Sequence, residues 1–133
     1  MEAAAASTEI AVLGWSVVLL LVQVILQATS TYDLGPYLLG PRDDNRQSGN
    51  VMAGRFKRAL ENLLETYPAF VALALALVVT GKSGGIAATG AWVWLAARVV
   101  YVPLYAFGVP AVRTLVWCVS IVGLLMMLFR LLF

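Results

Sequence analysis

Two stretches of this sequence place charged, amide and phenolic side chains at helical spacing within apolar surroundings. The first stretch is RFKRALENLLETYPAF, and its polar members recur every three or four residues. These members are Arg55, Arg58, Asn62 and Glu65. At about 100° per residue, the four fall within an arc of about 80° on one helix face. Glu61 lies outside this arc, so we expect it to be a solvated neighbour.

The second stretch, ARVVYVPLY, places Arg98, Tyr101 and Tyr105 on one face of another helix. Arg98 is its most informative residue, because apolar or small residues precede and follow it. A charged side chain at mid-bilayer costs at least about 2.5–3.5 kcal/mol on insertion scales and usually faces a bundle interior or a wet cavity. Prolines beside both polar stripes, Pro68 and Pro103, predict kinks in the two helices.

These residue types suit a ligand that carries both carboxylates and an ammonium group. Arginine binds carboxylates in a bidentate fashion, a glutamate such as Glu65 can pair with an ammonium, and Asn62 can bond a peptide unit. An arginine close to a bound thiol favours its thiolate form. The joint pattern therefore predicts a binding site for such a ligand.

Each feature taken alone also has a structural interpretation. The basic residues Arg55, Lys57 and Arg58 can form an interfacial snorkelling cluster. The amide and carboxylate can join helices, and the tyrosines can belong to an aromatic belt. What favours a site is that two helices carry coherent polar stripes at the same expected depth.

Composition identifies the elements that position these residues. The chain is 62% hydrophobic and 12% charged, against roughly 45–50% and about 25% in soluble domains. Four apolar stretches approach the roughly 20 residues that cross a bilayer. They cover residues 8–29, 55–80, 86–107 and 109–131. We predict an all-α fold, an integral membrane four-helix bundle, formed by a single domain of residues 1–133.

The remaining composition excludes several classes of protein. The net charge of +2 is too small for nucleic-acid binding. With no histidine and only Cys118, no metal, haem or disulfide framework is expected. The N-terminus lacks the basic region of a cleaved signal peptide, so we expect the first span to be retained. Ser7 is its predicted N-cap, with Glu9 in the first turn.

Basic residues predict the orientation. Positive charges gather around the long first loop and the start of the second span, at Arg42, Arg46, Arg55, Lys57 and Arg58. The positive-inside rule therefore places this loop in the cytoplasm and both termini outside. Arg113 fits this orientation, whereas Arg130 opposes it mildly. The acidic residues of the loop, Asp33, Asp43 and Asp44, are expected to be solvated.

The two stretches resemble the signature of the MAPEG family, the membrane-associated proteins in eicosanoid and glutathione metabolism. The matching residues are Arg55, Arg58, Ala59, Asn62, Glu65, Pro68, Phe70, Arg98, Tyr101 and Tyr105. With four spans and a long first loop, the resemblance covers essentially the whole chain. The sequence is also similar to the bacterial branch of the family and to microsomal glutathione transferases. This resemblance implies a multi-pass protein of the bacterial inner membrane.

The resemblance also implies a homotrimer with glutathione as co-substrate, bound between subunits toward the cytoplasmic leaflet. Members that use glutathione hold it with the residues matching Arg58, Asn62, Glu65, Tyr101 and Tyr105, with Arg55 and Arg98 close by. Hydrophobic electrophiles or lipid hydroperoxides reach the thiolate from the bilayer. Membrane lipids and hydrophobic small molecules are thus the implied partners.

The sequence departs from the leukotriene-forming branch of this family at three places. Leu60 stands where that branch has glutamine, and Thr66 stands where it has tyrosine, with Tyr67 displaced by one residue. Its thiolate-activating arginine aligns without gaps on Val112, and Arg113 is one residue further on. Arg113 is therefore the candidate catalytic residue.

The sequence supports three functional hypotheses. The leading one is a glutathione-dependent membrane transferase or peroxidase of the detoxifying kind. The second is a non-catalytic lipid-binding or scaffold protein of the same fold, because the family includes a lipoxygenase-activating protein that is not an enzyme. The third is a four-span exporter, disfavoured because the only carboxylate near the first span, Glu9, stands at its end.

Overall fold

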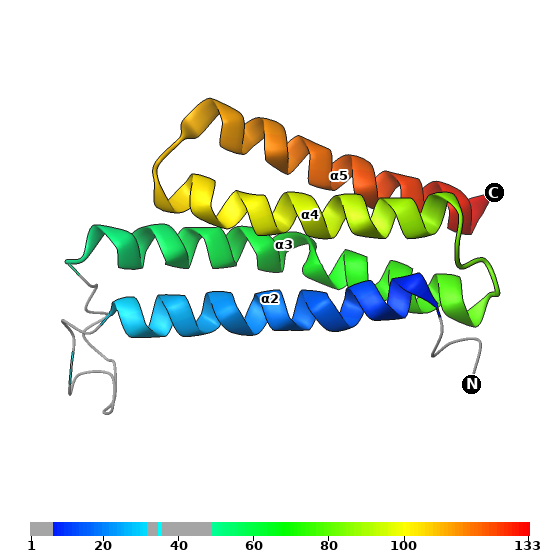
Figure 1. Cartoon of the computed structure of the whole chain (residues 1–133), viewed down its shortest axis with the longest axis horizontal. Coiled ribbons are helices and arrows are strands. Elements are labelled where there is room, and N and C mark those ends of the chain that lie inside the picture. Colours follow the sequence, from blue (N-terminus) through cyan, green and yellow to red (C-terminus); the bar gives the residue numbers. More distant parts are fainter. Residues whose placement is uncertain (1–6, 32–34, 36–48) are drawn as a thin grey trace.

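The computed structural model describes residues 7–31, 35 and 49–133, and this part of the chain folds into four antiparallel helices. They are α2 (Thr8–Ser30), α3 (Val51–Val79), α4 (Ile86–Ala106) and α5 (Pro110–Leu132). In Figure 1, α3 and α4 run side by side in the middle of the view, with α2 below and α5 above. All four are long and apolar enough to cross a membrane, which confirms the predicted all-α membrane fold.

The predicted spans agree with the helices except at the start of α3. This helix begins at Val51 rather than Arg55, because Asn50 caps it: the Asn50 Oδ1 accepts a hydrogen bond from Met52 N at 3.1 Å. Asn50 Nδ2 also donates to the Ser30 carbonyl at 3.0 Å, which ties the end of α2 to the start of α3. The loop residues Asp33, Arg42, Asp43, Asp44 and Arg46 lie outside the described residues.

Both internal prolines are accommodated within continuous helices, Pro68 in α3 and Pro103 in α4. The ribbon of α3 bends near its midpoint in Figure 1, as expected where proline removes a backbone donor. The predicted cap of α2 is confirmed, since Ser7 Oγ accepts a hydrogen bond from Ile10 N at 3.2 Å.

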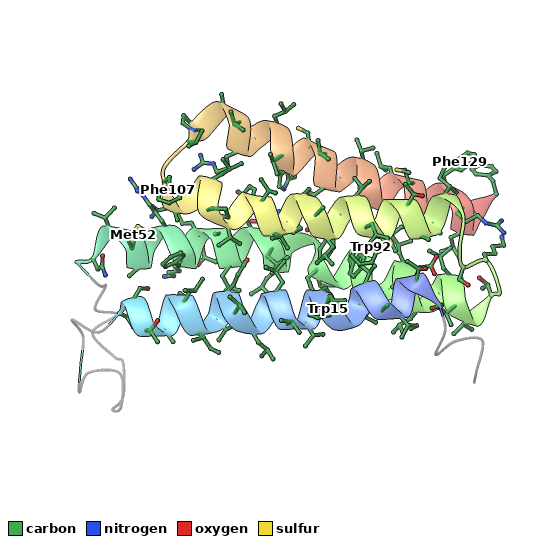
Figure 2. The ribbon with its side chains drawn as sticks, in the orientation of Figure 1. Trp15, Met52, Trp92, Phe107 and Phe129 are labelled. Atoms are coloured by element: carbon green, nitrogen blue, oxygen red, sulfur yellow. The ribbon has the colours of Figure 1, made fainter. Side chains whose placement is uncertain are left out.

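Aromatic packing joins α2, α3 and α4 in the core. The rings of Phe70 and Trp94 stack with centroids 4.0 Å apart and planes 6° apart, and Tyr67 packs against both. Ser16 Oγ donates its hydrogen to the Leu13 carbonyl at 2.5 Å. The Tyr67 hydroxyl lies 2.8 Å from Ser16 Oγ and is therefore the donor in that second bond. Aliphatic side chains point outward from the helices (Figure 2), as hydrocarbon surroundings favour.

A glycine pair allows α4 and α5 to approach each other closely. A Cβ atom on Gly90 would lie 2.6 Å from the Gly123 carbonyl oxygen, and a Cβ on Gly123 would lie 2.6 Å from the Gly90 carbonyl oxygen. Only glycine fits at either position, as is usual where membrane helices cross at short range. Figure 1 shows the two ribbons close together toward the C-terminus and separating toward the α4–α5 turn.

A second set of contacts holds the end of the bundle where α2 begins. Glu9 is fully buried, and its Oε1 accepts a hydrogen bond from the Gly84 amide at 2.8 Å. A carboxylate at this position complements the partial positive charge at the start of α4. Lys82 Nζ donates to the Leu131 carbonyl at 2.8 Å. Glu9 is therefore engaged in holding α2 against the α3–α4 turn, which further disfavours the exporter hypothesis.

Replacing Gly123 with alanine is expected to lower the free energy of unfolding by about 1–3 kcal/mol, because the added methyl overpacks the crossing with α4. Thermal unfolding in detergent, followed by circular dichroism, measures the effect. The matched control is Gly14→Ala, where no atom lies within 4 Å of the added Cβ. Equal stability of the two variants would show that the crossing is not closely packed.

Replacing Glu9 with alanine is expected to cost about 1–3 kcal/mol of stability, because the half-buried Gly84 amide loses its acceptor. Glu61→Ala, on an exposed position of α3, is the control and should stay within about 0.5 kcal/mol of the wild type. The same unfolding measurement compares them. An unchanged Glu9 variant would contradict the contact.

Candidate functional site

The candidate site starts from a buried arginine of α4. Arg98 is 1% exposed, and its Nη1 donates a hydrogen bond to Asn62 Oδ1 at 2.8 Å. Its Cζ lies 4.5 Å from the centroid of the Tyr101 ring, a distance at which the ring face attracts a cation. The Nε and Nη2 atoms of Arg98 are buried and have no hydrogen-bond partner. The stripes on α3 and α4 therefore meet at this pair.

Tyr105 continues the site toward the surface. Its hydroxyl accepts a hydrogen bond from Arg58 Nε at 3.2 Å, and its ring centroid lies 4.3 Å from the Arg113 Cζ. The rings of Tyr101 and Tyr105 are 5.7 Å apart. The two tyrosines thus connect guanidinium groups from three helices. We call this set the arginine–tyrosine cluster: Arg58, Asn62, Arg98, Tyr101, Tyr105 and Arg113.

Exposure changes steadily across the cluster. Arg98 and Tyr101 are buried, Tyr105 and Arg113 are half-buried, and Arg58 is exposed. Within the described residues, these arginines contact tyrosine rings, a phenol and an amide, and none of them pairs with a carboxylate. The cluster therefore has positive charge that a ligand with acidic groups can neutralise.

Glu65 lies on α3 at the edge of the cluster, less than one helical turn beyond Asn62. It is exposed, and within the described chain it forms no hydrogen bond or ion pair. A carboxylate in this state is available to a ligand cation, so the site offers one acidic group beside several basic ones. Glu61 is exposed as well, as the helical arc predicts.

Arg55 is placed differently from the other members of its stripe. Its Nη1 donates to the Ala106 carbonyl at 2.7 Å, so the guanidinium caps the C-terminus of α4. It does not contact either tyrosine of the cluster within the described structure. Helical spacing places Arg55 on the same face as Arg58, but it does not predict that Arg55 binds the backbone of α4.

The structure also places the residues at two of the three departures from the leukotriene-forming branch. Arg113 faces Tyr105, whereas the neighbouring Val112 is exposed. Tyr67 points to Ser16 on α2 and into the core, away from the cluster. The hydroxyl of Thr66 is buried and has no hydrogen-bond partner. Of the two positions on α5, Arg113 is therefore the one that reaches the cluster.

Two glycines shape the site and were not singled out from the sequence. A Cβ on Gly54 would lie 3.2 Å from the Arg58 Nη1, so this position leaves room for the guanidinium. A Cβ on Gly108 would lie 3.2 Å from the Arg55 Nη2. The available signal was the four-residue spacing of Gly54 and Arg58, which brings the two together on a helix.

The residues of the cluster can bind an anion. Among the described residues, no group of acidic, histidine or cysteine side chains is placed to hold a metal ion. The arginines offer forked donors for carboxylates, and the bond from Arg58 uses only the oxygen of the Tyr105 hydroxyl as an acceptor. The O–H group of Tyr105 can therefore donate a hydrogen bond to an anion at the cluster.

Comparison with known proteins gives one match. A family model described as the MAPEG family matches residues 10–133, nearly the whole chain. No curated protein and no solved structure matches.

The Arg98–Asn62 contact predicts a non-additive pair of substitutions. Asn62→Leu is expected to lower stability by about 1–3 kcal/mol, because it leaves a buried guanidinium with one partner fewer. Adding Arg98→Met should recover part of this loss, with a coupling energy of about 1–2 kcal/mol. Unfolding of the two single variants and the double variant in detergent measures the coupling. Additive losses would mean that the contact contributes no stability.

Proposed function

The chain belongs to the MAPEG family, and from that premise we propose that it is a glutathione-dependent membrane transferase or peroxidase. Its second substrates are hydrophobic electrophiles or lipid hydroperoxides, and its role is detoxification. The observation that carries the proposal is the arginine–tyrosine cluster beside an unpaired glutamate.

Glutathione carries two carboxylates, one ammonium group, two peptide units and a thiol, and the cluster complements these groups. Arg58 is exposed and can bind a carboxylate through its fork. Glu65 is available to the ammonium group. Asn62 accepts from Arg98 through Oδ1, which leaves its amide hydrogens to a carbonyl of the tripeptide.

Arg113 and Tyr105 are the groups placed to stabilise the thiolate. Arg113 is half-buried in the first turn of α5, where a guanidinium interacts with an anion more strongly than in water. The Tyr105 hydroxyl can donate a hydrogen bond to the same sulfur. The thiolate then attacks an electrophilic carbon: the new sulfur–carbon bond forms while the bond to the leaving group breaks, and the leaving group keeps that electron pair.

The surroundings of the site suit substrates that dissolve in the bilayer. The chain is an integral, multi-pass membrane protein, and large apolar side chains cover its outer faces. We propose that the site opens toward the cytoplasm, on the basis of the basic residues around the start of α3. A homotrimer in the bacterial inner membrane completes the proposal.

A second candidate function, a non-catalytic lipid-binding or scaffold protein, is favoured by one observation. A groove of about 340 Å³ between α2 and α4 is lined by apolar side chains. Its lining residues are Trp15, Val18, Leu19, Val22, Trp92, Leu95 and Val99. This candidate predicts lipid that co-purifies with the protein and no ultraviolet thiolate absorbance when glutathione is added.

Calorimetric titration of glutathione into detergent-solubilised protein tests the proposal. We expect binding by the wild type, and a loss of at least tenfold in affinity, about 1.4 kcal/mol, for Arg58→Ala and for Glu65→Ala. Each variant removes a group that pairs with an opposite charge on the tripeptide. Ultraviolet absorbance of the bound thiolate provides the second readout.

The matched control is Lys57→Ala, an exposed basic residue beside Arg58 that points away from the stripe. Its affinity should stay close to that of the wild type. The proposal fails if millimolar glutathione does not bind, or if both site variants bind as well as the control.

A further inference from the structure

The turn between α4 and α5 packs against Arg55 of α3. Arg55 Nη1 donates to the Ala106 carbonyl at 2.7 Å, at the last residue of α4. The Arg55 Nη2 and Cζ would lie 3.2 and 3.4 Å from a Cβ on Gly108. The guanidinium therefore lies directly against the turn, and a cation there also complements the negative end of the α4 dipole.

The turn has a defined backbone of its own. The amides of Phe107, Gly108 and Val109 donate to the carbonyls of Pro103, Tyr105 and Leu104, at 2.9, 3.1 and 3.0 Å respectively. Gly108 has a φ of +69°, a conformation that favours glycine. Its missing side chain also leaves the space that Arg55 fills. Arg55 on α3 and Gly108 within the turn thus act on the same feature.

Arg113 lies closer to this turn than to the close α4–α5 crossing. The close crossing of the two helices is at Gly123, which the helical rise places about 15 Å along α5 from Arg113. Toward Pro110 the two ribbons separate (Figure 1), and Phe107, labelled in Figure 2, marks where the turn meets the start of α3. Arg113 follows the turn within the first helical turn of α5.

We propose that Arg55 is a positioning residue, which holds the α4–α5 turn on α3 and thereby keeps the Arg113 guanidinium over the Tyr105 ring. It acts through Arg113, because its own guanidinium is bound to the end of α4. The consequence for catalysis rests on the proposed function, whereas the contact with the turn does not. The inference gives Arg55 a role distinct from that of Arg58, although the two share a helix face.

The first experiment uses the ligand-free protein in detergent. Hydrogen–deuterium exchange should become at least tenfold faster at the amides of residues 107–109 in Arg55→Met, because the turn loses its anchor. Exchange around Gly123 should not change. Arg55→Lys keeps a donor for the Ala106 carbonyl and should restore part of the protection. Lys57→Met, an exposed neighbour on α3, is the control.

The second experiment measures turnover and thiolate formation in the same variants. A displaced Arg113 should lower kcat about tenfold or more in Arg55→Met, with KM for glutathione changed by less than about threefold. The pH at which the bound thiol ionises should rise. Gly108→Ala should have the same effects although residue 55 stays arginine, because the added methyl pushes on the Arg55 guanidinium and strains the turn.

The outcomes separate the two proposals. If the wild type does not bind glutathione, the proposed function fails, and the exchange data still decide whether Arg55 anchors the turn. Unchanged exchange at residues 107–109 in Arg55→Met overturns the inference. So does a loss of glutathione affinity with unchanged exchange, since Arg55 would then contact the ligand directly. If Arg55→Met does not fold, Gly108→Ala is judged by the same two readouts.

Discussion

The structure depends on accommodating one guanidinium group inside a membrane-spanning helix bundle. Arg98 interrupts an apolar helix, and in hydrocarbon its charge would lack any partner. The bundle supplies Asn62 from α3 and the Tyr101 ring from the next turn of α4. Because Asn62 must face Arg98, their hydrogen bond constrains how α3 and α4 lie against each other. The remaining contacts between the two helices follow the same antiparallel register.

In that register, the apolar and the polar contacts between α3 and α4 lie on opposite sides of the Arg98–Asn62 pair. Phe70 stacks on Trp94 on one side of the Arg98 contact, and Arg58 bonds Tyr105 on the other. The first contact is an apolar core, whereas the second is a polar site that opens at the surface. The bend in α3 lies between the apolar and the polar part of this helix pair. One helix pair thus forms apolar core at one depth and a polar cluster at another.

Much of the fold follows from local patterns in the sequence, but several roles depend on tertiary contacts. Apolar length predicts four helices, and serine before an acidic first turn predicts the cap at Ser7. The apolar pattern predicts a later start for α3 than the structure has. The cap at Asn50 depends partly on a carbonyl of α2, which is a tertiary contact. Periodicity groups Arg55 with the site residues, yet its partner is the end of another helix. Likewise, only the geometry of the preceding turn decides that Arg113 rather than Val112 faces Tyr105.

The buried Arg98 also has a consequence for how the protein enters the membrane. A helix that carries an unpartnered guanidinium partitions poorly into lipid on its own, at a cost of at least about 2.5 kcal/mol. The helix that bears Asn62 is synthesised before α4, so the amide partner is already in place when α4 leaves the ribosome. Docking of α4 on α3 during insertion would thus give Arg98 a partner within the membrane. The order of the two helices along the chain favours this sequence of events.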